Sequence, residues 1–258
     1  MCGLAGVLLY PTRRSPEEWR AITNIATTNL LANEERGREA TGVAVIQTNG
    51  RGRVFKQPVP ASELVEIKNY QRLLSTVGDD TVCILGHTRM PTKGSRWRNV
   101  NNHPVTADHV IGVHNGTISN DDALFARLNL PRTGEVDSEI IFRLQDTVNP
   151  QRHNGQYSAL VQEKVNLLEG TFATLSVDLR RPTGLLILKQ LQPLCLHYEP
   201  ELEALFFSSR YVFLRQAFGR SVITEALESR HGFYFDARQL PQNGIRPVSC
   251  FDITFPSE

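Results

Sequence analysis

The chain has few cysteines and no long apolar segment. Its four cysteines, Cys2, Cys83, Cys195 and Cys250, lie far apart among 258 residues and form no Cys-x-x-Cys pair. This spacing argues against a structural zinc site, and the length of the chain argues against a disulfide framework. No apolar run approaches the length that crosses a bilayer, and a basic, apolar leader is missing. We therefore expect a cytoplasmic protein with reduced thiols and no membrane contact.

A large charge of either sign is also missing. Twenty-eight basic residues face 27 acidic ones, which gives a formal net charge of +1. Such a chain creates no general field that attracts nucleic acid or an anionic membrane. The basic stretch 94–98 contains Trp97 but is too short to indicate RNA binding, and we expect a loop there. A small neutral or zwitterionic ligand is the simpler expectation.

Short β-type runs dominate the pattern that is present. Helical segments fall between pairs of these runs rather than after each one. We expect strands at 3–9, 42–47, 82–85, 110–113, 172–177, 184–188, 204–207 and 232–235. We expect helices from 15 towards 33 and at 62–75, 120–128, 136–147, 158–168 and 211–218, with a long exposed loop at 149–155. Paired strands with helices at intervals predict an α+β fold in which antiparallel sheets pack together under helices.

The second residue of the chain is a cysteine. If the initiator methionine is removed, Cys2 carries both a thiol and a free α-amino group. The α-amino group has a reference pKa of about 7.7–8.0 and can accept a proton near neutral pH, while the thiolate is the form that attacks carbonyl carbon. The same residue also fits the start of a buried strand as a small hydrophobic side chain. Position alone does not decide between these two interpretations.

Polar groups follow two of the expected strands. Arg89 ends the run Gly-His-Thr-Arg at 86–89, where an arginine can hold a carboxylate with two parallel hydrogen bonds. Asn115 and Gly116 follow the strand at 110–113, and this dipeptide is a common hairpin turn. The same pair can also donate two hydrogen bonds to an oxyanion, from the side-chain amide of Asn115 and the backbone of Gly116.

Two further motifs are weaker. Arg36 and Gly37 stand at the end of the first expected helix, and Gly42 fits a close approach to a strand. Asp137 precedes an apolar helix, where it fits either a helix cap or a lone carboxylate that binds an ammonium group.

Taken in this order, the motifs resemble one family. They are Cys2-Gly3, Arg36-Gly37 with Gly42, Gly86-His87-Thr88-Arg89 with Thr92 and Gly94, Asn102-His103-Pro104, His114-Asn115-Gly116 and Val136-Asp137-Ser138-Glu139. The chain resembles the glutaminase domain of class II glutamine amidotransferases, and within them the amidotransferase half of glucosamine-6-phosphate synthase. The resemblance implies a single domain over 1–258 with the four-layer αββα sandwich of N-terminal-nucleophile hydrolases. Its motifs cover residues 2 to about 140.

The resemblance assigns roles to the catalytic residues and implies no metal and no cofactor. Cys2 would be the nucleophile, its own amine the base, and Asn115 with Gly116 the oxyanion hole. Arg36 and Gly37 would line the pocket beside Cys2.

The same resemblance implies a set of substrate-binding residues. Arg89 would hold the α-carboxylate of L-glutamine and Asp137 its α-ammonium, which would favour free glutamine over a peptide side chain. Thr92, Lys93 and His103 complete the implied substrate site. Met90, Pro91 and Lys93 depart from the family pattern of tryptophan, alanine and histidine, so the substrate wall can differ.

The implied activity is hydrolysis of the glutamine side-chain amide through a Cys2 γ-glutamyl thioester, with ammonia passed to a separate synthase partner. Two other functions remain open: a stand-alone amidohydrolase acting on a γ-glutamyl compound, and a non-catalytic glutamine-binding regulatory module. The acceptor of the ammonia, the partner and the oligomeric state are not encoded in any motif.

Overall fold

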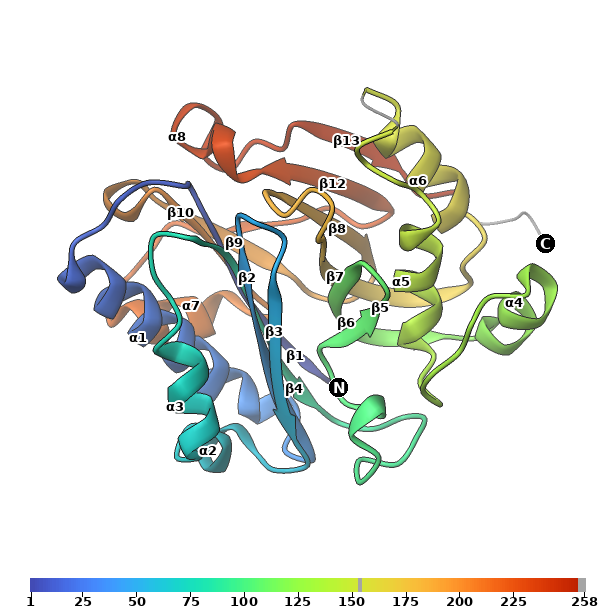
Figure 1. Cartoon of the computed structure of the whole chain (residues 1–258), viewed down its shortest axis with the longest axis horizontal. Helices are drawn as coiled ribbons and strands as arrows, with labels where there is room; N and C mark the ends of the chain where they lie inside the picture. Colours follow the sequence, from blue (N-terminus) through green and yellow to red (C-terminus); the bar gives the residue numbers. More distant parts are fainter. Residues whose placement is uncertain (153–154, 255–258) are drawn as a thin grey trace.

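The structure is a computed structural model that describes residues 1–152 and 155–254. Two antiparallel sheets form its centre (Figure 1). The first sheet has the order β11-β9-β10-β1-β4-β2-β3 and the second the order β13-β12-β8-β7-β6-β5. The strands of the first sheet are β1 (Gly3–Leu9), β2 (Ala40–Gln47), β3 (Gly52–Gln57), β4 (Thr81–Arg89), β9 (Cys195–Glu199), β10 (Ala204–Ser208) and β11 (Glu225–Ala226). Those of the second are β5 (Val105–Ala107), β6 (Val110–Ile118), β7 (Gly170–Asp178), β8 (Gly184–Gln190), β12 (His231–Asp236) and β13 (Ser249–Asp252).

Helices cover the outer faces of both sheets. On the first sheet lie α1 (Pro16–Asn33), α2 (Ala61–Leu64), α3 (Lys68–Leu74) and α7 (Tyr211–Phe218). On the second lie α5 (Ser138–Asp146) and α6 (Tyr157–Val165), with α4 (Asp121–Leu128) beside α5 (Figure 1). The short helix α8 (Leu240–Asn243) follows β12. This order of helix, sheet, sheet and helix confirms the predicted αββα arrangement.

Alternation along the strands builds the core between the sheets. Leu4 and Leu8 of β1 face the same apolar layer as Leu175 of β7 and Ile187 of β8. The intervening residues pack outward against the helices, so both faces of each central strand are buried. This double burial explains why the strands read as near-continuous apolar runs in the sequence.

Local signals fixed the first helix. The side chain of Ser15 accepts a hydrogen bond from the backbone of Glu18, whose carboxylate accepts one from the backbone of Ser15. Pro16 occupies the first helical position. This capping box satisfies donors that the first turn leaves open, and the predicted start of the helix is confirmed.

Several boundaries differ from the predictions. The expected helix at 62–75 is two helices, α2 and α3, and the strands β3, β5, β9, β11 and β13 were not predicted. The hairpin interpretation of Asn115 and Gly116 is wrong, because both residues lie inside β6 and Gly116 pairs with Phe172 of β7. The loop at 94–98 is confirmed. Residues 153 and 154 of the predicted loop 149–155 lie outside the described residues.

Candidate active site

Cys2 lies where the two sheets meet at one end of the sandwich. Its backbone nitrogen donates a hydrogen bond to Oδ1 of Asn115 over 3.0 Å, which joins the start of β1 to the middle of β6. Figure 1 shows the N-terminus beside the ends of these strands. Met1 precedes Cys2 and is 70% exposed, so it stands outside the fold.

The two residues predicted to line the site beside Cys2 contact this region. Arg36, in the 3₁₀ helix Glu34–Arg36 after α1, donates from Nε to the carbonyl of Cys2 over 2.7 Å. Gly37 follows, and a Cβ atom there would lie 2.5 Å from the backbone carbonyl carbon of Arg89. A side chain at position 37 would therefore push apart the segments that flank the thiol.

The thiol of Cys2 is protonated in its resting environment. Burial raises the pKa of the Cys2 thiol, and the backbone amide of Met90 and the charge of Arg89 oppose this rise only in part. The Met90 amide nitrogen lies 3.4 Å from Sγ. Since the thiolate is the nucleophile, this thiol requires a base to remove its proton before it can attack.

A small polar pocket, with a volume of about 20 Å³, opens beside the thiol. Its walls come from the residue before β1, from the end of β4 and the loop after it, from the segment before β5, from β6 and from the start of α5. It is lined by Cys2, Arg89, Met90, Thr92, Lys93, His103, His114, Gly116, Val136, Asp137 and Ser138. Every predicted substrate residue is among them, and so are two of the predicted catalytic residues, Cys2 and Gly116.

Arg89 is buried and already engaged with the loop that covers it. Its Nη1 donates to Oδ1 of Asn102 over 2.8 Å, and its Nη2 donates to the carbonyls of Lys93 and Gly94 over 2.6 and 2.9 Å. An arginine can bind a carboxylate with two parallel hydrogen bonds either from Nη1 and Nη2 or from Nε and Nη2. Both arrangements use a hydrogen on Nη2. A two-bond grip on a substrate carboxylate therefore requires the loop carbonyls to release Nη2.

Asp137 and Lys93, two charged residues of the pocket, have different partners. Asp137 is 4% exposed, and its Oδ2 accepts a hydrogen bond from the backbone of Ile118 over 2.7 Å. Its Oδ1 has one long contact, with the hydroxyl of Ser138. The ammonium group of Lys93, a predicted substrate residue, pairs with Asp121 over 2.7 Å and with Asp122, so it connects the pocket loop to α4.

Three buried histidines form the floor behind the pocket. The rings of His87 and His103 stack with centroids 4.2 Å apart, and His114 lies 6.4 Å from His103. Burial lowers the pKa of His87 to about 3 and holds the pKa of His103 well below its ordinary value. These rings are neutral at physiological pH. Neither ring nitrogen of His103 has a partner in the described residues.

Asn115 and Gly116 are held rigidly in β6. Gly116 has φ of +139°, and a Cβ there would lie 1.9 Å from the carbonyl oxygen of Thr171. The side-chain amide nitrogen of Asn115 donates to Oε1 of Gln192 over 3.1 Å. The backbone and the side chain of this pair are therefore both fixed before any ligand binds, as an oxyanion-binding group requires.

Sequence reasoning missed two residues of this network. Asn102 lies in a motif that was noticed, but its contact with Arg89 was not foreseen. Gln192 lies 77 residues from Asn115 in a loop between β8 and β9. Only the pairing of β6 with β7 and of β7 with β8 brings it close, so no local pattern indicated it.

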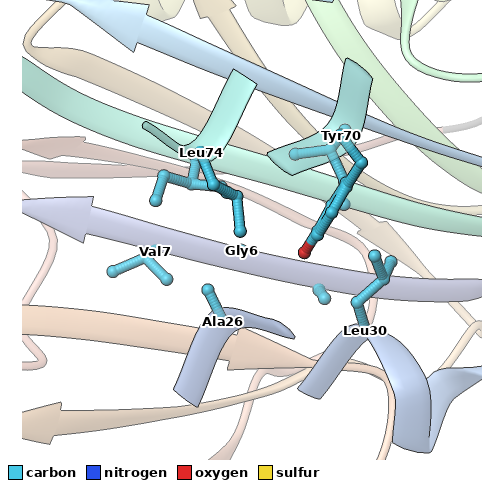
Figure 2. A pocket seen from close by; sticks show the side chains of 10 residues that line it. Gly6, Val7, Ala26, Leu30, Tyr70 and Leu74 are labelled. Atoms are coloured by element: carbon cyan, nitrogen blue, oxygen red, sulfur yellow. The ribbon is translucent and has the colours of Figure 1, made fainter. Parts of the chain in front are cut away.

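A second cavity, of about 10 Å³, is lined almost entirely by apolar groups. Figure 2 shows Tyr70 and Leu74 of α3 facing Ala26 and Leu30 of α1 across Val7 of β1. The hydroxyl of Tyr70 is already hydrogen-bonded to Thr27 over 2.8 Å. Among the described residues, no group of three His, Cys, Asp or Glu side chains could hold a metal ion.

Known proteins resemble this chain in sequence. No family model matches it. The 7-cyano-7-deazaguanine synthase of Saccharolobus solfataricus is 28% identical over 212 residues, covering 81% of this chain and 43% of that protein. The glutamine–fructose-6-phosphate aminotransferase of Escherichia coli K12 is 26% identical over 228 residues, covering 84% of this chain and 34% of its own length. The chain thus spans less than half the length of these relatives.

Solved structures share the fold. The glutamine phosphoribosylpyrophosphate amidotransferase of Bacillus subtilis aligns over 98% of this chain and 49% of its own, with a TM-score of 0.69 at 16% identity. A glutamine aminotransferase class-II domain protein from Silicibacter pomeroyi aligns over 98% of this chain and all of its own, with a TM-score of 0.59 at 14% identity. The predicted resemblance to glutamine amidotransferases is confirmed by these relatives, and the proteins that the chain resembles are enzymes. The solved structures confirm the predicted α+β sandwich of two antiparallel sheets.

In the described part of the chain, no helix combines the length and the apolar character that a membrane crossing needs.

Proposed function

We propose that this chain hydrolyses the side-chain amide of L-glutamine, with Cys2 as the nucleophile once Met1 has been removed. The observation that supports the proposal is the hydrogen bond from the Cys2 nitrogen to Asn115, next to a pocket that Cys2 and Gly116 line. The exposure of Met1 leaves it accessible for removal without unfolding. The glutamine-named relatives support the same substrate.

The proposed reaction starts with a proton transfer. The free amine of Cys2 takes the thiol proton, and Sγ then forms a bond to the side-chain carbonyl carbon of glutamine. The carbonyl oxygen becomes an oxyanion that accepts hydrogen bonds from Asn115 and Gly116, each worth roughly 2.7–4 kcal/mol in comparable sites. The carbon–nitrogen bond breaks as the amine returns its proton to the leaving ammonia. Water then cleaves the γ-glutamyl thioester and releases glutamate.

Substrate selection follows from the two opposite charges in the pocket. Arg89 provides a cation and Asp137 a carboxylate, which match the α-carboxylate and α-ammonium of a free amino acid. We propose that the substrate carboxylate replaces a loop carbonyl at Nη2 of Arg89. Thr92, Lys93 and His103 line the remaining wall, so the loop 90–98 adjusts as glutamine binds.

We propose that the ammonia serves a synthase. The relatives extend well beyond the matched region, and one group of them is named for a synthase. The acceptor would sit on a partner or on further chain. A stand-alone amidohydrolase for a γ-glutamyl compound predicts full turnover without any acceptor. Glutamine hydrolysis that rises when a candidate synthase and its acceptor are added would favour the synthase role.

Cys2→Ala tests the catalytic assignment, with Cys250→Ser as a control at an exposed cysteine on β13. Wild type and the control should lose Met1, release ammonia from glutamine and form a covalent adduct with a glutamine-like electrophile. Cys2→Ala should do neither of the last two. Ammonia release by Cys2→Ala would overturn the proposal. A processed wild type that binds glutamine without turnover would favour the regulatory module.

A further inference from the structure

A third pocket, of about 410 Å³, includes Ser209, which is hydrogen-bonded to Leu4 near the start of β1. In the first sheet it borders β9 and the end of β10, which is the neighbour of β1. In the second it borders β8, two strands from β6. It is thus a separate pocket beside the proposed active site.

Lys189 is the unusual group in this pocket. Ile187, two residues earlier on β8, belongs to the core between the two sheets, and residues two apart on a strand share a face. Lys189 therefore faces the space between the sheets, and it is only 6% exposed. In the described residues its ammonium group has no carboxylate within ion-pair distance and no hydrogen-bond acceptor. Burial lowers the pKa of Lys189 accordingly. The Nζ atom is not among the enclosed polar atoms that lack a partner, so it stays open to the pocket, where a bound anion would give it a partner.

The other groups in the pocket also suit an anion. Arg210 lies at its rim, where it pairs with the exposed Glu35, a contact that solvent weakens. Ser209 accepts a hydrogen bond from the backbone of Leu4 and so keeps its hydroxyl hydrogen free to donate. Tyr211 and Thr224 add two more hydroxyl groups. No acidic residue lines this pocket.

We propose that this pocket binds the phosphate group of a small molecule, with Lys189 as its central cation. The lining holds two cations and three hydroxyl groups, which come from separate parts of the chain. This number of donors suits the three terminal oxygens of a phosphate better than the two oxygens of a planar carboxylate. The site is distinct from the Cys2 pocket and does not depend on glutamine hydrolysis.

Inorganic phosphate is the probe, and acetate is the comparison ligand. Phosphate should bind to wild type in calorimetry and raise its Tm, and acetate should bind at least tenfold more weakly. Lys189→Met should lose phosphate binding at least tenfold, while Lys68→Met, at an exposed site on α3, should bind as wild type does. Wild type that ignores phosphate, acetate that binds equally well, or Lys189→Met that binds normally would each overturn the proposal.

A second measurement avoids substitution. Acylation of lysines on the native protein, followed by peptide mapping, should show that phosphate protects Lys189 and leaves Lys68 unprotected. Equal labelling of Lys189 with and without phosphate would contradict the site even if Lys189→Met failed to fold.

A separate set of hydrogen bonds concerns Gln192. Its Oε1 accepts from the amide nitrogen of Asn115, and its Nε2 donates to Oγ1 of Thr171 over 3.0 Å. Thr171 belongs to β7, the strand that pairs with β6. The amide of Asn115 is therefore held from both ends, by the Cys2 nitrogen and by Gln192, with one N–H left for an oxyanion.

We infer that Gln192 is a positioning residue that fixes the amide of Asn115 for the proposed hydrolysis, an inference that rests on the proposed function. Gln192→Met keeps the size of the side chain and removes the acceptor, and Thr171→Val removes the anchor. Each should lower kcat about tenfold, which corresponds to the loss of one hydrogen bond, and leave KM for glutamine unchanged.

The outcomes distinguish a failure of the proposed glutamine hydrolysis from a failure of the positioning role of Gln192. Wild type without glutaminase activity would defeat the proposed function. Active wild type with normal kcat in both variants, or a rise in KM with normal kcat, would defeat the positioning role alone. A role in packing alone would leave Gln192→Met near wild type, because methionine fills a similar volume.

Discussion

The polar pocket beside Cys2 and the apolar cavity beneath α3 are both small, at about 20 and 10 Å³, but they differ in the groups that line them. The first gathers charged and hydrogen-bonding groups from five segments of the chain. The second is enclosed by aliphatic side chains and one tyrosine whose hydroxyl is satisfied (Figure 2). Size alone therefore does not indicate a functional site. Convergent polar groups, held in place before a ligand arrives, do.

We therefore expect substitutions at the two pockets to change different quantities, the reaction rate at one and the free energy of unfolding at the other. Removing a fixed donor at the polar pocket should lower the rate of the proposed reaction and leave the fold in place. Removing an apolar group at the cavity should lower the free energy of unfolding and leave kcat unchanged. Four changes test the separation.

Asn115→Ala should have the largest effect. It removes the proposed oxyanion donor, so kcat should fall by 10²–10³, roughly 2.7–4 kcal/mol in the barrier. Glutamine hydrolysis with purified, Met1-processed protein measures this loss, and thermal unfolding checks the fold. Near-normal kcat in a folded Asn115→Ala protein would remove the distinction between the pockets.

Leu30→Ala is the reciprocal change at the apolar cavity. Leu30 is 2% exposed, and loss of a buried leucine side chain costs 2–5 kcal/mol. We expect about 2–3 kcal/mol, at the low end, because the existing cavity already deprives Leu30 of contacts on one side. Urea unfolding measures it. A fall in kcat of tenfold or more in the folded variant would show that the two regions are coupled.

The fold was predictable where local signals and tertiary structure agree. β1 and α1 were placed well because a continuous apolar run and a capping box act within a few residues. Asn115 and Gly116 misled for the opposite reason. The dipeptide suits a hairpin turn, but pairing with Phe172 and its neighbours, 56 residues away, keeps it in an extended strand. Tertiary pairing overrode the local preference.

The sequence predicted which residues line the candidate site but not the hydrogen bonds and ion pairs that they form. The motifs named the groups that line the pocket. They could not show that Arg89 is held by the carbonyls of its own loop, or that Lys93 pairs with Asp121. Such contacts depend on where the loop 90–98 lies in space. Gln192 and Lys189 belong to no motif and become visible only when β6, β7 and β8 stand side by side.

Acid should lower the free energy of unfolding, because the buried His87 behind the polar pocket is neutral in the folded state. His87 has a pKa of about 3 in the folded state and an ordinary value of 6.5, so the unfolded state binds more protons between these values. Stability is then constant above pH 6.5 and falls as the pH drops towards 3, by about 2 kcal/mol at pH 5 from His87 alone. Urea unfolding from pH 8 to 5 measures the slope.

Two variants locate the acid sensitivity. His87→Gln should be less stable at pH 8 but should show a shallower loss on acidification. Leu30→Ala should keep the wild-type slope, because it changes no titratable group. An unchanged slope in His87→Gln would assign the acid sensitivity elsewhere.

Tyr70→Phe should have the smallest effect on the free energy of unfolding. It tests whether the hydroxyl of Tyr70 or the apolar packing of its ring stabilises this region. The change removes the hydroxyl that meets Thr27 and leaves the ring that walls the cavity. Thr27 is partly exposed and can turn its hydroxyl to water, so the cost should be about 1 kcal/mol or less. Thermal unfolding measures it, and kcat should match wild type. A larger loss would mean that the single polar contact, rather than apolar packing, holds α3 against α1.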